Sequence, residues 1–326
     1  MAGGKGTRLR PLTCNHPKPM VPIANRPMME HIIALLNRHH FSDVMATLFY
    51  LPESIQNHFG DGRNFGMRIH YAVEESPLGT AGSVRNGAGF LDETFLVISG
   101  DTLTDIDLGA AMAFNRERGA TATLILTLVN NPLEYGVVIT DEEGRIRRFL
   151  EKPGWGEVFS DTVNTGIYIL EPKIFNEYQA GQVFDFSKDL FPLLLGKGEP
   201  IYGFVADGYW SDIGNLEQYR QAHYDILNGK VRLTIPGREI RPGVWVGENT
   251  KVDATVSLNG PVLLGDFCEI GPQADIDEFC VIGDYSVIGE GSSIKRSILW
   301  ERTFIGDYSE LRGAILGRNS FLKGKN

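Results

Sequence analysis

Two different hydrophobic patterns divide the chain. Up to about residue 235, short apolar or alternating segments typical of β-strands are separated by amphipathic segments typical of helices. This alternation predicts an α/β domain with a mostly parallel sheet, in which ligands bind beyond the carboxyl ends of the strands. The expected strands are 43–50, 94–99, 122–129 and 135–140, and the expected helices are 27–39, 79–89, 108–118 and 187–195.

The second pattern repeats every six residues. From residue 246 to residue 294 each sixth residue is aliphatic, and after a shift of one residue the repeat resumes. No helix has a period of six, so the pattern predicts a parallel β-helix in which each hexapeptide contributes one aliphatic side chain to a shared interior. We therefore expect two domains, 1–235 and 236–326. The aliphatic positions are Val246, Val252, Leu258, Leu264, Ile270, Ile276, Ile282, Ile288 and Ile294, followed by Leu299, Ile305, Leu311, Leu316 and Leu322.

The charge balance excludes one class of partner. The 326 residues include 31 basic and 41 acidic side chains, which gives a net charge of −10. The overall field of such a protein does not hold nucleic acid, whereas a few local basic residues can bind a phosphorylated small molecule. The three cysteines lack the spacing of a zinc site, and no segment approaches the roughly 18 apolar residues of a membrane span. We expect a cytoplasmic protein that binds neither nucleic acid nor membrane.

The N-terminal segment carries the first candidate chemistry. Gly3, Gly4 and Gly6 allow the backbone to approach a ligand closely, and their N–H groups can converge on phosphate oxygens. The segment is not a Walker A loop, and it is not a dinucleotide fingerprint because Leu9 stands at the third glycine position. Basic residues and prolines between residues 8 and 20 distinguish it from a plain flexible terminus.

The glycine-rich segment is the first of a series of motifs. In chain order the series is Gly3-Gly-Lys-Gly-Thr-Arg-Leu-Arg-Pro-Leu-Thr13, Pro17-Lys-Pro-Met20, Leu78-Gly-Thr-Ala-Gly82, Ser99-Gly-Asp101, Glu134-Tyr-Gly136, Glu151-Lys-Pro153, Asn164-Thr-Gly-Ile-Tyr168 and Trp210-Ser-Asp-Ile-Gly214. Together these motifs resemble the sugar-phosphate nucleotidyltransferase family, and most of all its mannose-1-phosphate guanylyltransferases. The resemblance covers almost the whole chain. It implies a Rossmann-like catalytic domain followed by a left-handed β-helix, and transfer of a nucleotidyl group from a nucleoside triphosphate to a sugar 1-phosphate with release of pyrophosphate.

Such a reaction brings two polyanions together, so charge neutralisation and in-line positioning carry most of the catalysis. Asp101 follows an apolar strand and is therefore expected at the sheet edge where ligands bind. In the family context we expect Asp101 and Asp212 to hold Mg²⁺, which prefers oxygen ligands. The resemblance also implies that Arg8 and Lys18 are catalytic cations over the triphosphate, with Arg8 stabilising charge on the departing pyrophosphate.

The resemblance implies a sugar-phosphate site as well. Lys152 is expected to hold the phosphate, and Glu151 and Asn164 are expected to accept hydrogen bonds from sugar hydroxyls. Gly136 is expected to leave room for the sugar ring.

The choice of base is predicted from the loop that contains Gly79 and Thr80. Glu74, or Glu75 beside it, precedes this loop, and an ionised carboxylate can only accept hydrogen bonds. Guanine offers two adjacent donors on its Watson–Crick edge, whereas uracil and thymine offer one donor and two carbonyls. We therefore expect GTP, with Glu74 reading the guanine.

Two alternatives stay open. One is a relative that uses UTP, dTTP or ATP with glucose 1-phosphate. The other is a non-catalytic regulatory subunit that binds sugar nucleotides. Such a subunit would be expected to lose at least one of five charged residues that are all present here: Arg8, Lys18, Asp101, Lys152 and Asp212. An acyltransferase on the β-helix is set aside because all seven histidines lie at or before His223. We expect the β-helix to support a homo-oligomer.

Both ends of the sequence are abrupt. In the family, the glycine-rich loop follows an apolar strand, of which only Met1 and Ala2 are present here. The hexapeptide pattern runs to Leu322 without a capping segment. We expect a longer natural chain at both ends, and poor stability and weak activity for a chain that begins at Met1.

Overall fold

The computed structural model describes residues 1–129, 131–151, 154 and 160–324. They form two compact units, each assembled from separate stretches of the chain. The first unit comprises Met1–Gly6, Asn15–Met20 and Ile32–Asp212, and the second comprises Thr7–Cys14, Val21–His31 and Ile213–Asn326. The predicted domain boundary at residues 235 and 236 and the expected missing ends stay predictions.

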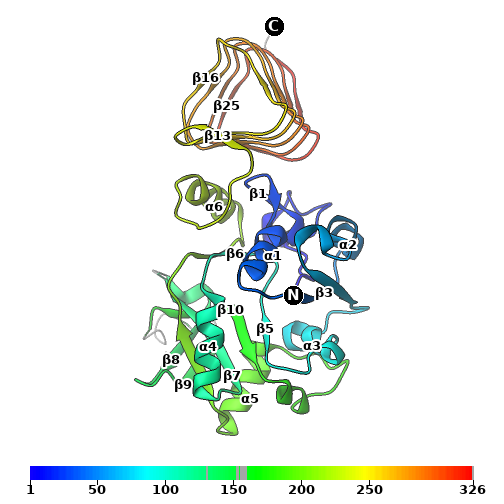
Figure 1. Ribbon diagram of the computed structural model, residues 1–326, viewed down its shortest axis with the longest axis vertical. Helices are drawn as coiled ribbons and strands as arrows, with labels where there is room; N and C mark the ends of the chain where they lie inside the picture. Colours follow the sequence, from blue (N-terminus) through cyan, green and yellow to red (C-terminus); the bar gives the residue numbers. More distant parts are fainter. Residues whose placement is uncertain (130, 152–153, 155–159, 325–326) are drawn as a thin grey trace. The chain divides into compact units, whose positions relative to one another are not determined.

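A six-stranded sheet is the centre of the first unit (Figure 1). Its order is β11-β7-β10-β8-β9, and β5 also pairs with β10. β7 and β11 are parallel, whereas β10 is antiparallel to β5, β7 and β8, so this sheet is mixed. The strands are β5 (Phe95–Val97), β7 (Ala122–Leu128), β8 (Gly136–Thr140), β9 (Ile146–Glu151), β10 (Thr162–Leu170) and β11 (Ile201–Val205).

A parallel pair of strands and several helices complete the first unit. β3 (Asp43–Leu48) and β4 (Arg68–Val73) are parallel, and the crossover between them contains α2 (Pro52–Phe59). The remaining helices of this unit include α3 (Gly79–Arg85), α4 (Leu108–Arg118) and α5 (Phe191–Gly196), and α1 (Met28–Arg38) belongs to it from Ile32 onward. The core between sheet and helices buries Leu124, Leu126, Val138, Tyr168, Phe186 and Phe191.

A short antiparallel ladder joins β6 (Thr102–Thr104) to β12 (Trp210–Asp212). In this ladder Asp212 is opposite Thr102, the residue that follows Asp101. The pairing therefore brings the end of the Ser99-Gly-Asp101 motif next to the Trp210-Ser-Asp-Ile-Gly214 motif, which lies far away in the sequence.

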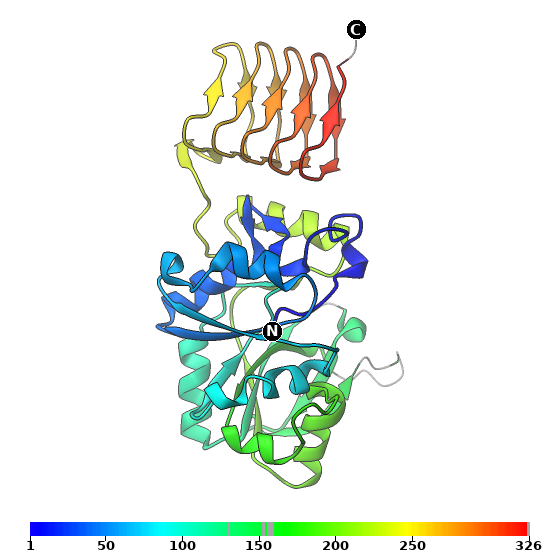
Figure 2. The ribbon, with the colours of Figure 1, turned by 90° about the vertical axis from the view of Figure 1, so that its right-hand side faces the viewer.

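The hexapeptide region of the second unit is a three-sided parallel β-helix, seen end-on in Figure 1 and from the side in Figure 2. β13 (Arg238–Arg241) pairs with its first strand in antiparallel orientation. Its three ladders are β14-β17-β20-β23-β26 (Val244–Val246, Val262–Leu264, Cys280–Ile282, Ile298–Leu299, Ile315–Leu316), β15-β18-β21-β24-β27 (Lys251–Val252, Glu269–Ile270, Val287–Ile288, Phe304–Ile305, Phe321–Leu322) and β16-β19-β22-β25 (Ser257–Leu258, Asp275–Ile276, Ser293–Lys295, Glu310–Arg312).

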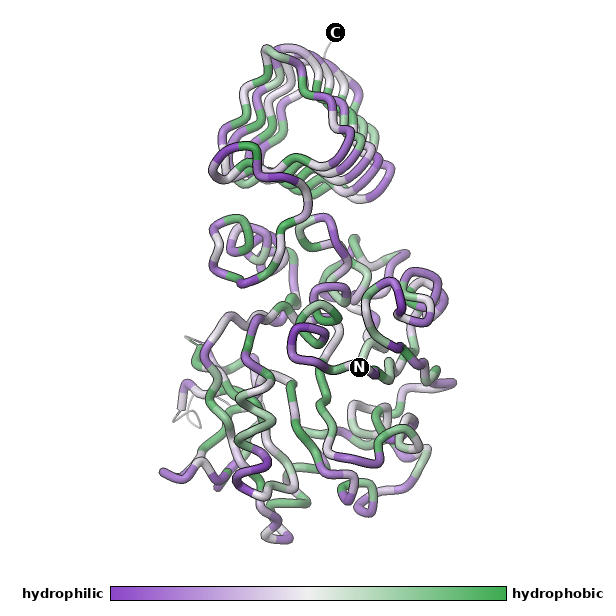
Figure 3. Tube along the Cα trace, viewed as in Figure 1, coloured by the Kyte–Doolittle hydropathy of each residue, from purple (hydrophilic) through white to green (hydrophobic). Residues whose placement is uncertain are grey.

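The length of each coil explains the shift in the repeat. Ile276 pairs with Ile294, 18 positions further on, whereas Ile288 pairs with Ile305, only 17 positions further on. One residue is therefore missing from each later coil, and the aliphatic side chains still stack in register. The predicted interior positions between residues 270 and 305 are all buried, and apolar positions recur from coil to coil in Figure 3.

Bulky residues occupy one corner of the β-helix in a left-handed backbone conformation. Phe267, Tyr285 and Arg302 have φ values of 54°, 58° and 56°, which residues of this size rarely adopt. The rings of Phe267 and Tyr285 stack with centroids 5.0 Å apart, and the Arg302 guanidinium lies 5.9 Å from the Tyr285 ring. Contacts between successive coils therefore offset the conformational cost of the corner.

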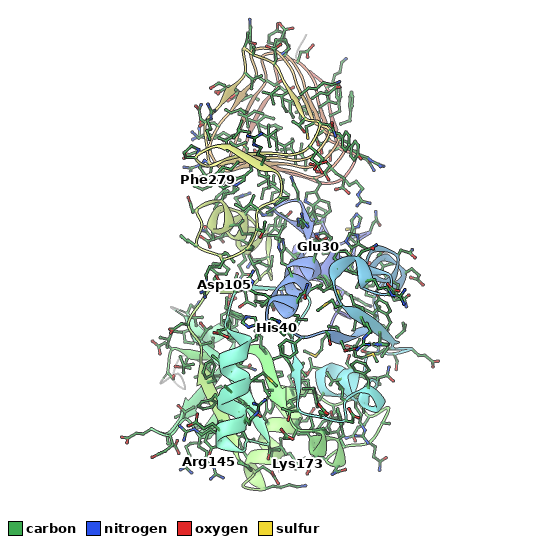
Figure 4. All side chains as sticks on the ribbon, viewed as in Figure 1. Glu30, His40, Asp105, Arg145, Lys173 and Phe279 are labelled. Atoms are coloured by element: carbon green, nitrogen blue, oxygen red, sulfur yellow. The ribbon has the colours of Figure 1, made fainter. Side chains whose placement is uncertain are left out.

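Helix α6 (Leu216–Leu227) is fastened to the β-helix within the second unit. The Tyr219 hydroxyl donates to the Pro22 carbonyl at 2.7 Å and accepts from the Trp300 indole N–H at 2.9 Å. Tyr224 packs on Phe279, which is labelled in Figure 4, with ring centroids 4.6 Å apart. The hydrogen bonds matter because an unpaired buried hydroxyl would be costly.

The structure confirms the α/β class and the parallel β-helix, while the hand of the β-helix stays a prediction. Each expected strand and helix has a counterpart, although the expected helix 187–195 begins with a π-helical turn, Phe186–Leu190. Among the helices of the described residues, none has the length and apolar character needed to cross a membrane.

Replacing an interior aliphatic residue tests the β-helix core. Ile270→Ala is expected to destabilise the protein by about 2–5 kcal/mol, because it removes a buried side chain from a packed interior. The neighbouring Glu269 points outward and forms an exposed ion pair with Lys251, so Glu269→Ala is expected to cost less than about 1 kcal/mol. Urea unfolding of both variants is the measurement, and equal losses would contradict the assignment of the interior.

Candidate functional site

Three of the predicted site residues meet in the first unit. The Lys18 ammonium lies 2.8 Å from Asp101 Oδ2 and 3.2 Å from Asp212 Oδ1. Only 6% of the Lys18 side chain is exposed, against 26% for Asp101 and 29% for Asp212. The carboxylates therefore converge on one cation, and both keep a face toward solvent.

Backbone register places these residues. Asp101 follows β5 and precedes β6, and the β6–β12 ladder sets Asp212 beside the start of β6. Met1 and Ala2 lie at the same edge, since Gly100 N–H donates to the Met1 carbonyl and Ala2 N–H donates to the Thr47 carbonyl. The glycine-rich segment thus begins next to Asp101.

Two residues that the sequence analysis missed hold the β6–β12 ladder. Asp105 Oδ1 accepts from Tyr209 N–H at 2.7 Å, and Thr104 Oγ1 donates to the Tyr209 carbonyl at 2.8 Å. Asp105, labelled in Figure 4, is buried, and a Cβ on Gly208 would lie 2.8 Å from its carboxylate. An aspartate four positions after Asp101 gave no signal in the sequence, because its partners lie about a hundred residues away.

The protonation states follow from mutual charge. Burial would lower the pKa of Lys18, but the carboxylates of Asp101 and Asp212 outweigh it and raise that pKa. Burial would raise the pKa of Asp101, but the Lys18 ammonium and the hydrogen bonds from Lys18 and Ser99 outweigh it and lower that pKa. At neutral pH Lys18 is therefore a cation and Asp101 an anion.

The donor set fits Mg²⁺. Within the described residues, no group of three or more His, Cys, Asp or Glu side chains could enclose a metal ion. Mg²⁺ commonly takes one or two carboxylates and completes its shell with substrate phosphates and water. Asp101 and Asp212 match that requirement. To bind a metal ion they would have to lose their ion pairs with Lys18, whose ammonium would then turn toward a phosphate.

The three glycines of the N-terminal segment differ in their surroundings. A Cβ on Gly3 would lie 3.2 Å from the Phe49 Cβ, so packing requires a small residue there. Gly6 has a φ of 60°, which glycine adopts at little cost. A Cβ on Gly4 would meet no atom within 4 Å, so space above this residue is open to a ligand.

Arg8 belongs to the second unit, where it packs on Gly214. A Cβ on Gly214 would lie 2.7 Å from Arg8 Nη1, so the missing side chain makes room for the guanidinium. Gly214 N–H donates to Gln218 Oε1 at 2.8 Å, which fixes the turn. Gly214 ends the Trp210-Ser-Asp-Ile-Gly motif, so this contact gives a physical reason for the last glycine of that motif.

The predicted base-binding residues Gly79 and Thr80 contact Phe184, Asp185 and Phe186. Gly79 has a φ of 74°, and a Cβ there would lie 2.6 Å from the Phe184 carbonyl oxygen. The Thr80 hydroxyl donates to Asp185 Oδ2 at 2.8 Å and accepts from Phe186 N–H at 2.9 Å. Both residues therefore have a structural explanation, and their contact with a base stays a prediction.

Glu74 is buried at the start of the same loop. Its Oε2 accepts from Leu78 N–H at 3.2 Å, and its Oε1 accepts from the Ser83 hydroxyl. Glu75, the other candidate, is exposed. Glu74 thus stabilises the loop that leads into α3 by hydrogen bonds to Leu78 and Ser83 in the protein interior.

Three of the four predicted sugar-phosphate residues, Gly136, Glu151 and Asn164, lie on three adjacent strands. Glu151 in β9 is opposite Gly136 in β8, and Asn164 in β10 is one position beyond the Val137–Val163 pair. Their backbones are therefore neighbours across the sheet. The side chain of Glu151 and all of Lys152 lie outside the described residues.

Asn164 is itself held in place. Its amide donates to the Tyr168 hydroxyl at 2.9 Å, and its carbonyl oxygen accepts from Gly166 N–H at 3.0 Å. Next to it, the Trp210 indole donates to the Thr165 carbonyl at 3.0 Å. This contact ties β10 to the strand that ends at Asp212.

A cavity of about 420 Å³ lies at the opposite end of β5. It is lined by Thr94, which precedes β5, by Thr121, by the last turns of α4, and by Lys173, which Figure 4 labels. No predicted site residue lines this cavity. The candidate site is therefore the edge that carries Lys18, Asp101 and Asp212.

Removing the cation tests the cluster. Lys18→Met is expected to destabilise the protein by about 3 kcal/mol at pH 7, because two largely buried carboxylates lose their partner. The stabilisation that accompanies the lowered pKa of Asp101 is complete above the ordinary aspartate pKa of about 3.9 and is lost as the pH falls below that value through the lower pKa of the folded state. The difference in unfolding free energy between wild type and variant should therefore narrow at lower pH. Urea unfolding at pH 7 and at about pH 3.5 measures it, with the exposed Lys5→Met as control. A gap that stays constant with pH would contradict the pairing.

Known proteins share these features. Residues 1–229 match the nucleotidyl transferase family, and residues 261–296 match the bacterial transferase hexapeptide (six repeats) family. The chain is 38% identical over 327 residues to a UTP–glucose-1-phosphate uridylyltransferase from Synechocystis sp., with 95% of this chain and 84% of that relative covered. It is 36% identical over 298 residues to a mannose-1-phosphate guanylyltransferase from Mycobacterium tuberculosis, with 91% and 82% covered.

A solved structure is also similar. The crystal structure of HddC from Yersinia pseudotuberculosis matches with a TM-score of 0.60 and 26% identity, and the match covers 69% of this chain and 96% of that one. These findings confirm the resemblance inferred from the motifs. The matched region holds Lys18, Asp101 and Asp212. The chain belongs to the nucleotidyl transferase family.

Proposed function

We propose that the protein transfers a guanylyl group from GTP to mannose 1-phosphate, forming a nucleotide sugar and pyrophosphate. The observation that carries this proposal is the buried Lys18 ammonium between the carboxylates of Asp101 and Asp212, next to a glycine-rich segment. A cation between two anions suits a site for a metal–triphosphate complex, because the metal can take the carboxylates while the ammonium turns to a phosphate.

In the proposed reaction, an oxygen of the sugar phosphate attacks the α-phosphorus of the triphosphate. The bond from this phosphorus to the oxygen that bridges to the β-phosphate breaks, and its electron pair leaves with pyrophosphate. Lys18 and Arg8 neutralise phosphate charge, and the backbone of Gly4 leaves open space for a phosphate. Asp101 and Asp212 would hold Mg²⁺, which would supply further charge neutralisation.

The sugar phosphate belongs on the strands β8, β9 and β10 in this proposal. Gly136 has no side chain that would fill the site, and the Asn164 amide is fixed by its hydrogen bond to Tyr168. Trp210 lies next to Asn164 because its indole donates to the Thr165 carbonyl. Glu151 and Lys152 complete the proposed sugar-phosphate site.

Guanine is favoured by the acceptor-only carboxylate of Glu74 and by two relatives. One is the Mycobacterium tuberculosis mannose-1-phosphate guanylyltransferase. The other is HddC, whose structure in complex with GMP-PN matches this chain with 26% identity and a TM-score of 0.59. Magnesium dependence, a cytoplasmic location and a homo-oligomer supported by the β-helix belong to the same proposal.

One observation favours a second candidate, uridylyl transfer to glucose 1-phosphate. The Synechocystis uridylyltransferase is 38% identical to this chain, and the match covers 95% of it. A carboxylate can accept the single N–H donor of uracil as well, so Glu74 does not exclude UTP.

A substrate matrix tests the function. GTP, UTP, dTTP and ATP are each combined with mannose 1-phosphate and glucose 1-phosphate in the presence of Mg²⁺, and the nucleotide sugar is detected by mass. We expect the highest kcat/KM for GTP with mannose 1-phosphate. Asp101→Asn is expected to lower kcat by at least about a hundredfold, since it removes an anionic ligand of the Mg²⁺ that would neutralise the phosphates. Asp43→Asn is the control, because it affects a surface ion pair with Arg68 and a surface hydrogen bond from Ser42.

Product with UTP and glucose 1-phosphate as the best pair would establish the second candidate instead. No product from any pair would favour a regulatory subunit that binds sugar nucleotides without converting them.

A further inference from the structure

Two buried hydroxyl groups form a chain that ends on Glu74. Ser83 Oγ on α3 lies 2.8 Å from Thr47 Oγ1 on β3, and it also donates to Glu74 Oε1. The exposed fractions are 3% for Thr47, 7% for Ser83 and 8% for Glu74. A hydroxyl has only one proton, so Ser83 must accept from Thr47 in order to donate to the carboxylate. The chain therefore runs from Thr47 through Ser83 to Glu74.

The second carboxylate oxygen of Glu74 is held separately. Its Oε2 accepts from Leu78 N–H at 3.2 Å, in the loop that leads into Gly79. One oxygen is thus fixed by a side chain of α3 and the other by the backbone of the loop. Each oxygen can accept more than one hydrogen bond, so Glu74 retains capacity for a ligand.

Rotation of a carboxylate about its terminal bond is soft, because the last torsion of a glutamate side chain has broad minima. Two fixed donors on opposite oxygens suppress this rotation. Loss of the Ser83 hydroxyl would leave the carboxylate plane held by the Leu78 N–H only. The plane matters for guanine, whose two adjacent donors require both oxygens in one orientation, and matters less for uracil, which offers one donor.

We propose that Ser83 is a positioning residue that sets base selectivity by fixing the plane of the Glu74 carboxylate, with Thr47 orienting the Ser83 hydroxyl. This inference rests on the proposed function and deepens it. Ser83 acts through Glu74 and does not touch Lys18, Asp101 or Asp212 in the structure. The chemical step itself is therefore expected to proceed nearly unchanged without it.

The test is the ratio of kcat/KM for GTP to kcat/KM for UTP at saturating sugar 1-phosphate. Ser83→Ala is expected to lower this ratio about three- to tenfold, the effect of weakening one hydrogen bond to a charged group. The loss should fall on the KM for GTP, with kcat changed by less than about twofold. Ser83→Thr keeps the hydroxyl and should keep the ratio. Thr47→Val should lower the ratio less, and it keeps the test available if Ser83→Ala does not fold.

Thr123→Val is the matched control. It removes a buried hydroxyl that accepts from the Asn115 amide at 2.9 Å, away from the Glu74 loop. It should lower stability without moving the ratio. The inference is overturned if Ser83→Ala leaves the ratio unchanged, whether both kcat/KM values stay the same or both fall by the same factor. A wild type that makes nucleotide sugar without preferring GTP also overturns it, whereas a wild type that makes none overturns the proposed function.

Discussion

The ion pairs of Lys18 with Asp101 and Asp212 are the constraint on which the rest of the candidate site depends. They join three parts of the chain: the segment after the glycine-rich turn, the end of β5 and the end of β12. Without the cation, two carboxylates would face each other in a largely buried position, which is strongly unfavourable. In the proposed function the same arrangement would suit polyanionic substrates, because a metal ion held by the carboxylates would take the place of the ammonium. Folding and the proposed chemistry therefore both require that these three side chains lie close together.

Polar groups near this cluster are fixed by hydrogen bonds to one another. Asp105 and Thr104 hydrogen-bond to Tyr209 and so fix the ladder that ends at Asp212, and Asp185 hydrogen-bonds to Thr80 in the first turn of α3. Ser187, two positions after Asp185, lies 3.5 Å from the Asn164 amide on the proposed sugar side. A single short segment thus contacts both halves of the proposed substrate site. Such supporting contacts keep substrate-binding groups within the tolerance that catalysis requires.

Local patterns in the sequence predict the repetitive parts of the fold well. The predicted aliphatic residues from Leu258 to Ile305 are buried in the β-helix, and the one-residue shift before Leu299 corresponds to the shorter later coils. α4 matches its predicted range because Asp107 caps its start and Gly119 ends it in a left-handed conformation. Asp101 at the end of a buried strand is also predictable. In each case the signal lies within a few residues of the feature.

The rest depends on contacts between distant segments. The antiparallel pairing of β10 is not apparent from its sequence, because the direction of a strand depends on its distant partners. Gly166, with a φ of 78°, also interrupts the regular register of this strand. The sequence predicts Glu74 as the residue that reads the base, and only the packing of α3 against β3 shows that Ser83 and Thr47 hold it. The role of Asp105 depends on Tyr209 in the same way. The sequence identified residues that could bind phosphate and metal, but not the residues that position them.

The central claim is that Asp101 and Asp212 share a metal ion bound to a triphosphate. The most direct measurement is a crystal structure of the protein with Mn²⁺ in place of Mg²⁺ and a non-hydrolysable nucleoside triphosphate, with the metal located by anomalous scattering. The account predicts a Mn²⁺ peak between the carboxylates of Asp101 and Asp212, with the Lys18 ammonium turned toward a phosphate oxygen. A triphosphate and metal bound elsewhere, with Lys18 still paired to both carboxylates, would contradict it.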